Sequence, residues 1–206
     1  MCAIIKNFHQ ELSKMNEKEY IENFLIYTLS IVISGNKPSA TVTLKKGENS
    51  NYDKWIKYGV DFVKRIGLKY IALRESSKAV ILLVYNEKVL ESYIFAEETL
   101  EFLISIGYKS NDSLNNCLNI LKERYNIYHC PHELGVFLGF PVNDVKDFME
   151  CTSKKCLMCG YWKVYNNLDY AVETFEKFDL IRKEAAQNII YGLNSQELIV
   201  KLQEIC

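Results

Sequence analysis

The sequence predicts an α+β fold: a small mixed sheet of about four strands, helices mainly on one face, and a helical C-terminal part. Three observations indicate this class. Residues 40–45 alternate and are rich in β-branched side chains, which is typical of a strand. Two apolar runs, 69–74 and 78–85, are separated by three polar residues, as in a β-hairpin. Residues 168–190 repeat apolar side chains at helical spacing.

Capping and periodicity signals place the elements of the first half. Helices are predicted over residues 5–14 and 17–33, the second capped by Asn16. A unit with the order strand, helix, strand, strand then occupies residues 37–86. Its helix runs over residues 51–66, where apolar side chains form one broad stripe.

The second half, residues 87–206, is predicted to be mostly helical with one further strand. The helices are predicted over 88–106, 113–125, 133–138, 142–149, 168–190 and 195–205, and the strand over 161–165. Three prolines and nine glycines in 206 residues leave no room for a long flexible linker. We therefore interpret residues 1–206 as a single domain that begins with a helical segment, residues 1–36.

Composition limits where the protein acts. Hydrophobic residues make up 49% of the chain and charged residues 25%, which is typical of a globular protein rather than a disordered one. The most apolar run, residues 24–33, is about half the roughly 20 residues that a membrane span needs. Glutamates precede it, so it does not resemble a signal peptide. We expect no membrane span and a cytoplasmic location.

The charge is unevenly distributed. Residues 37–78 carry ten Lys/Arg against four Asp/Glu, whereas residues 79–206 carry twelve against eighteen. The basic segment could face an anionic ligand or simply be a solvated helix face. Neither an aromatic-basic RNA-binding signature nor zinc-finger spacing occurs, so a nucleic-acid partner is not expected. A protein partner or a homo-oligomer is left open.

Residues 129–165 concentrate the side chains that could carry chemistry, with four of the seven cysteines and two of the three histidines. Cys156 and Cys159 have the spacing of a thiolate knuckle, and Gly160 after them would relieve its tight turn. Completed by His132 and Cys151, the pair could hold zinc or iron. The alternative is that the cysteines are reduced thiols that pack like small apolar residues.

Three segments also resemble a known family. They are residues 132–141 (HELGVFLGFP), 144–148 (DVKDF) and 159–165 (CGYWKVY), called the signature segments below. They resemble the signature of an uncharacterised bacterial domain-of-unknown-function family, found mainly in anaerobic Firmicutes-type bacteria. The pattern includes His132, Glu133, Cys159 and Lys163 but neither Cys130 nor Cys151. The resemblance implies where a site lies and carries no activity with it.

Three hypotheses about function follow, and whether the protein is an enzyme stays open. The first is a metal- or redox-associated protein with its site at Cys156, Cys159 and His132, with Glu133 orienting His132. The second is a non-catalytic binding or adaptor protein whose signature segments are structural. The third is an enzyme acting on an anionic small molecule. Its ligand-binding residues would be Lys37, Arg74, His132, Glu133 and Lys163. A pocket that converges on His132 and Lys163 would favour this third hypothesis.

Overall fold

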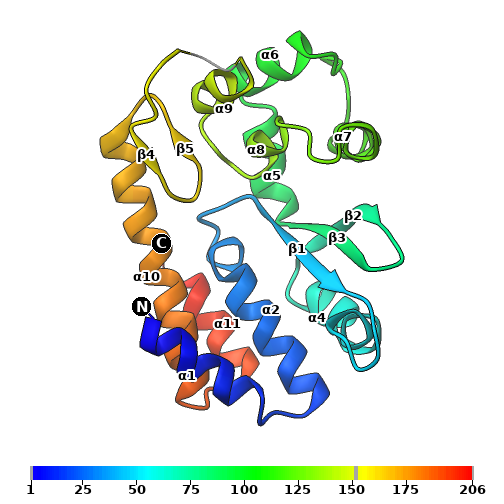
Figure 1. Cartoon of the computed structure of the whole chain (residues 1–206), viewed down its shortest axis with the longest axis vertical. Coiled ribbons are helices and arrows are strands. Elements are labelled where there is room, and N and C mark those ends of the chain that lie inside the picture. The colour runs from blue at the N-terminus through cyan, green and yellow to red at the C-terminus, as the bar shows by residue number, and fades with distance from the viewer. Residues whose placement is uncertain (1, 151–152, 206) are drawn as a thin grey trace.

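A three-stranded antiparallel sheet lies between two helical layers in the computed structural model, which describes residues 2–150 and 153–205 (Figure 1). The central strand is β3 (Ala79–Tyr85), flanked by β1 (Ser39–Lys45) and β2 (Lys69–Glu75). Strands β2 and β3 form the predicted hairpin, with a register shift between Ala72 and Arg74. The α+β class and the hairpin predicted from the sequence are confirmed.

One helical layer combines the two ends of the chain. It contains α1 (Cys2–Leu12), α2 (Glu17–Ile33), α3 (Asn51–Lys54), the π-helical turn η1 (Trp55–Gly59), α4 (Val60–Arg65), α10 (Leu168–Ile190) and α11 (Ser195–Gln203). Val42, Leu82 and Val84 of the sheet belong to the core that these helices form. The predicted helix over 51–66 is therefore present, with a π-helical turn at its centre.

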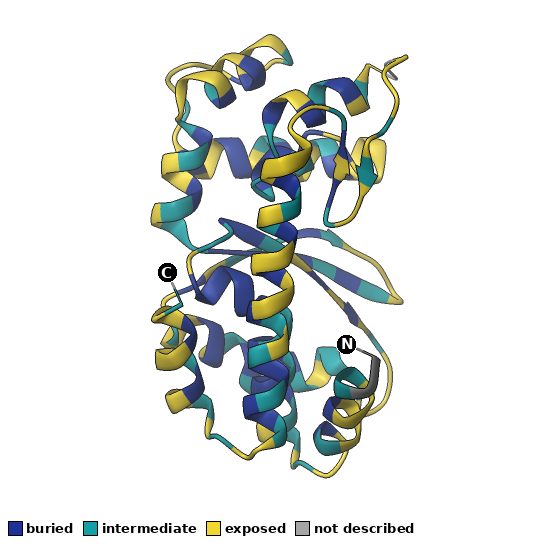
Figure 2. Ribbon diagram, turned by 90° about the vertical axis from the view of Figure 1, so that its left-hand side faces the viewer, coloured by how far each residue is buried: buried dark blue, intermediate teal, exposed yellow. Residues whose placement is uncertain are grey.

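The other layer covers the opposite face of the sheet. It contains α5 (Glu87–Ile94), α6 (Glu97–Ser105), α7 (Leu114–Tyr128), α8 (Leu134–Phe137) and α9 (Val142–Met149). Leu73, Leu83 and Tyr85 belong to this second core. Successive strand residues point to opposite faces, so the continuous apolar run of β3 supplies both cores. The helices were predicted mainly on one face; the structure packs them on both, and Figure 2 shows buried residues along the sheet between them.

Two predicted elements differ from the structure in more than their end residues. The helix predicted over 88–106 is divided into α5 and α6, because Ala96 adopts an extended conformation and starts α6 with Glu97 and Glu98 in its first turn. The strand predicted over 161–165 is β5 (Lys163–Val164). It pairs with β4 (Met158–Cys159) in a separate two-stranded hairpin instead of joining the main sheet, which is antiparallel throughout.

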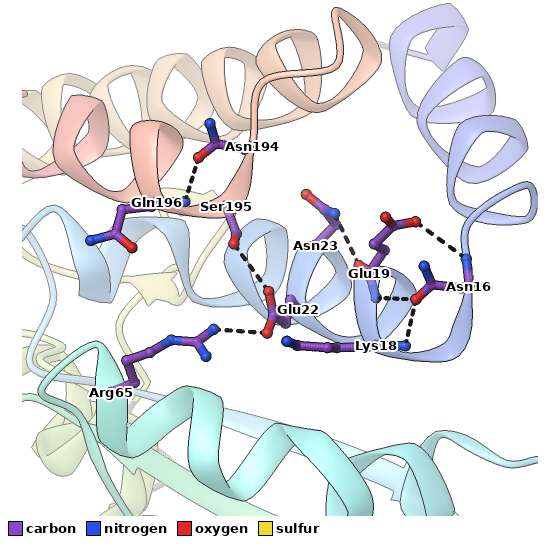
Figure 3. A network of polar contacts seen from close by, with 9 residues as sticks. All are labelled: Asn16, Lys18, Glu19, Glu22, Asn23, Arg65, Asn194, Ser195 and Gln196. Carbon is purple, nitrogen blue, oxygen red and sulfur yellow. Dashed lines mark hydrogen bonds and ion pairs between the residues drawn. The ribbon is translucent and has the colours of Figure 1, made fainter.

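Polar contacts hold the first helical layer together (Figure 3). Asn16 caps α2 as predicted, its side chain accepting from the backbone of Lys18 and Glu19 at 3.1 and 3.0 Å. The buried carboxylate of Glu22 accepts from Arg65 Nη2 of α4 at 2.7 Å and from Ser195 Oγ of α11 at 3.0 Å. These contacts join the end of the chain to its beginning. Within the part of the chain that the structure describes, no helix is long and apolar enough to cross a membrane.

Candidate functional site: an apolar pocket formed by the signature segments

The signature segments enclose a cavity of about 280 Å³, called the signature pocket below. It lies among the loop before α8, helices α8 and α9, and the β4–β5 hairpin. Its lining residues are Cys130, Pro131, His132, Leu134, Gly135, Leu138, Phe140, Asp144, Val145, Phe148, Trp162 and Lys163. Most of these side chains are apolar or aromatic, which is typical of small-molecule sites.

One buried carboxylate holds the hairpin against α9. Asp144 is 3% exposed, and its Oδ2 accepts from the indole Nε1 of Trp162 at 2.8 Å. Its Oδ1 accepts from the backbone N–H groups of Tyr165 and Asn166 at 2.9 and 3.0 Å, and from Asn166 Nδ2 at 2.9 Å. Four donors compensate the cost of burying this charge. Asp144 therefore positions Trp162 in the pocket wall.

A second aspartate, one turn further along α9, extends this network. Asp147 Oδ2 accepts from Asn166 Nδ2 at 2.9 Å and from Lys154 Nζ at 2.7 Å. The hydrogen bond from the Lys154 ammonium group is the largest cause that holds the pKa of Asp147 below its usual range. Asn166 thus bridges the two aspartates, so α9 and the hairpin form one connected wall.

His132 and Lys163 both meet Phe148 at the pocket. The His132 ring lies edge-on to the Phe148 ring, with centroids 4.9 Å apart. Lys163 Nζ lies 5.2 Å from the centroid of the same ring, within the range of a cation–π contact. Residues 31 positions apart are thereby brought together, as the third hypothesis required.

The other predicted ligand-binding residues lie elsewhere. Glu133 is 1% exposed and accepts a hydrogen bond from Arg124 Nε of α7, so it pairs with Arg124 instead of orienting His132. Arg74 lies on β2, where its charge acts on Tyr125 of α7. Lys37 lies over the Phe140 ring, 5.2 Å from its centroid. Neither Arg74 nor Lys37 is among the residues that line the signature pocket.

The predicted metal ligands do not form a cluster in the described residues. Cys156 Sγ donates to the backbone oxygen of Met158 at 3.2 Å, and Cys159 is exposed with a free thiol. No three side chains of the types His, Cys, Asp and Glu converge as a metal site within residues 2–150 and 153–205. Cys151, the predicted further ligand, lies outside the described residues.

Gly160 is needed for close packing. A Cβ atom at this position would lie 2.2 Å from Cε2 of Phe175 on α10. The Phe175 ring is itself packed against Trp162, with centroids 4.5 Å apart, so it has little freedom to move. The glycine that follows the Cys156–Cys159 pair therefore lets the hairpin approach α10, a role that does not depend on a metal.

Replacing Gly160 with alanine should lower the free energy of unfolding by about 2 kcal/mol, because the added methyl group overpacks the contact with Phe175. Urea denaturation would measure this change. Combining Gly160→Ala with Phe175→Leu should cost less than the sum of the two single changes. Strict additivity of the two changes would contradict this explanation.

Three important residues of this region, Asp144, Asp147 and Trp162, were not among the predicted site residues. Asp144 and Asp147 are three positions apart within one signature segment, which places both carboxylates on one face of α9. This spacing could have identified both aspartates as candidate site residues from the sequence. Trp162 was visible in the signature as well, but its contact with Asp144 depends on how the hairpin packs on α9.

The fold and the site define an α+β protein whose signature segments enclose an apolar pocket. The chain belongs to the DUF3793 family, described as proteins of unknown function, which it matches over residues 25–199. The resemblance to a domain-of-unknown-function family is thereby confirmed. Comparison with curated proteins and with solved structures gave no match.

Proposed function

We propose that this protein binds a small, largely apolar molecule with an anionic group in the signature pocket. The observation that carries the proposal is the pocket itself, an apolar cavity into which His132 and Lys163 converge from separate signature segments. Its volume of about 280 Å³ is near the lower end of the range for small-molecule sites, roughly 300–1,000 Å³. A ligand with a single ring fits this size.

The polar groups of the pocket indicate the ligand's charge. Both carboxylate oxygens of Asp144 are occupied by donors from Trp162, Tyr165 and Asn166. Lys163, in contrast, takes part in none of the ion pairs formed among the described residues. A ligand's carboxylate beside Lys163 would gain a charge-assisted contact in a mostly apolar setting. The ligand class is therefore an aromatic or aliphatic anion.

The pocket supports ligand binding more directly than the other hypotheses. A metal or redox function at Cys156 and Cys159 stays a prediction, as does an adaptor role for the signature segments. Cys130 and His132 both line the pocket, but none of the contacts described among the pocket residues defines a reaction. Binding is therefore the function we propose.

Calorimetric titration with two small probes, benzoate and the neutral benzyl alcohol, tests the proposal. We expect benzoate to bind the protein more tightly than benzyl alcohol, and Lys163→Gln to remove that preference. Lys177→Gln, an exposed change on α10, is the charge-matched control. Leu138→Trp fills the pocket and should abolish binding of both probes, whereas Leu180→Trp, at an exposed position of α10, should not. Equal binding to wild type and Leu138→Trp would contradict the proposal.

A further inference from the structure

A row of four aromatic rings runs from the edge of the signature pocket to α10. The ring centroids of Phe140 and Trp162 are 5.5 Å apart, those of Trp162 and Phe175 are 4.5 Å apart, and those of Phe175 and Tyr161 are 5.5 Å apart. The row joins the turn after α8, the β4–β5 hairpin and α10. The two middle rings, those of Trp162 and Phe175, are buried, so the two end rings are the ones that cations contact.

A cation lies on each end ring of this row. Lys37 Nζ, from the loop between α2 and β1, lies 5.2 Å from the Phe140 centroid. The guanidinium carbon of Arg182, on α10, lies 5.2 Å from the Tyr161 centroid. The two residues are 145 positions apart in the sequence, and the fold places them at the two ends of the same row of rings.

Both cations lack a negative partner among the residues that the structure describes. Neither Lys37 nor Arg182 forms an ion pair there, and Arg182 Nε is buried with no hydrogen-bond acceptor. Burial, and then the positive charge of Arg182, lowers the pKa of Lys37 to about 8. A buried donor without an acceptor, and two positive charges that repel each other, destabilise the free protein.

The nearby carboxylate of Asp179 does not compensate these charges. It accepts a hydrogen bond from the Tyr161 hydroxyl at 2.9 Å and forms an ion pair with neither cation. Asp179 therefore positions Tyr161, whose ring supports Arg182. The donors of Lys37 and Arg182 stay available for a ligand.

We propose that Lys37 and Arg182 form a binding site for a phosphate-type oxyanion, separate from the signature pocket. A guanidinium group offers a fork of N–H donors that suits such an oxyanion, and a lysine adds a second point charge. A phosphate group carries between one and two negative charges at pH 7, which matches the two cations. The ligand is either free phosphate or the phosphoryl group of a larger molecule. This proposal goes beyond the binding function of the pocket and does not depend on it.

Calorimetric titration of the full chain with inorganic phosphate and with methyl phosphate tests the site. Arg182→Gln and Lys37→Gln should each weaken phosphate binding by about tenfold or more, because each removes a charged donor. Arg182→Lys keeps the charge and should retain most of the affinity. Lys183→Gln, at the exposed neighbouring position of α10, is the matched control and should change affinity less than about twofold. Tighter binding of methyl phosphate would identify a phosphoryl group of a larger molecule, and tighter binding of phosphate would identify the free ion.

Two results would overturn the proposal. One is the absence of saturable phosphate binding to the wild-type protein, and the other is equal weakening by Lys183→Gln and Arg182→Gln. Lys163→Gln removes a charge that lies over Phe148, a ring outside the aromatic row, and should leave phosphate binding unchanged. Failure of the pocket proposal and failure of the oxyanion proposal are therefore distinguishable.

Discussion

Replacing Asp144 with asparagine is expected to lower the free energy of unfolding by about 3 kcal/mol. Its two carboxylate oxygens accept four hydrogen bonds, from Trp162, Tyr165 and twice from Asn166. An asparagine keeps one acceptor oxygen and turns the other into a donor, which then faces another donor. Because Asp144 is buried, water cannot replace the lost contacts.

Urea denaturation followed by tryptophan fluorescence would measure this loss. Asp169→Asn, an exposed aspartate in the first turn of α10, serves as the control and should cost less than about 1 kcal/mol. The Asp144 variant should also lose benzoate binding, since Trp162 is then no longer held in the pocket wall. Unchanged stability of Asp144→Asn would contradict the role assigned to this carboxylate.

Replacing Glu133 with alanine is expected to cost a similar amount, about 3 kcal/mol. The Glu133 carboxylate is almost fully buried and pairs with Arg124, whose Nη1 also donates to the backbone oxygen of Ile106 at 3.2 Å. Removing the glutamate leaves the partly buried guanidinium without its negative partner. The loop that carries His132 would lose its anchor to α7 at the same time.

A double-mutant cycle separates this ion pair from general packing. The combination Glu133→Leu with Arg124→Met removes both charges and should cost less than Glu133→Ala alone. Glu11→Ala, which breaks the more exposed pair with Lys14, should change stability by less than about 1 kcal/mol. An additive cycle at Glu133 and Arg124 would show that the ion pair is not responsible.

The sequence predicted elements well where local signals were complete. Helix α2 begins directly after the predicted cap Asn16, and α10, which Asn167 caps, has the predicted bounds. Helix α9 has the predicted bounds as well, although no side chain caps it and Pro141 precedes it. The break between α5 and α6 was missed since Ala96 carries no turn signal and the apolar pattern continues across it. At this point the packing of two short helices, and not the apolar periodicity of the sequence, determines where the first helix ends.

The sheet faces could not be predicted from local patterns. A continuous apolar strand such as β3 fits a buried strand covered on one face or on both, and only the second helical layer decides this. The short β4–β5 hairpin likewise depends on Asp144, which is 14 or more positions away from every residue of both strands. Contacts between residues so far apart in the sequence do not produce a local sequence pattern from which they could be predicted.

Part of the site could be predicted because it lies in the signature segments. His132 and Lys163 were both selected from them, and both line the pocket. Glu133 was selected too, but its partner Arg124 comes from a helix with no recognisable motif. Lys37 was placed with His132 and Lys163, whereas the structure places it over the Phe140 ring and outside the lining of the pocket. A contact between two charged residues that are far apart in the sequence produces no recognisable spacing in the sequence.

The indole N–H signals of the two tryptophans provide the most direct test of the signature pocket as a ligand site. Trp162 lines the pocket, whereas Trp55 is buried in the core on the other side of the sheet from α8 and α9. In a two-dimensional ¹H–¹⁵N NMR titration with benzoate, the signal of Trp162 should shift to saturation while that of Trp55 stays in place. A saturable shift of Trp55 with no change at Trp162, or no shift of either signal, would contradict the proposed function.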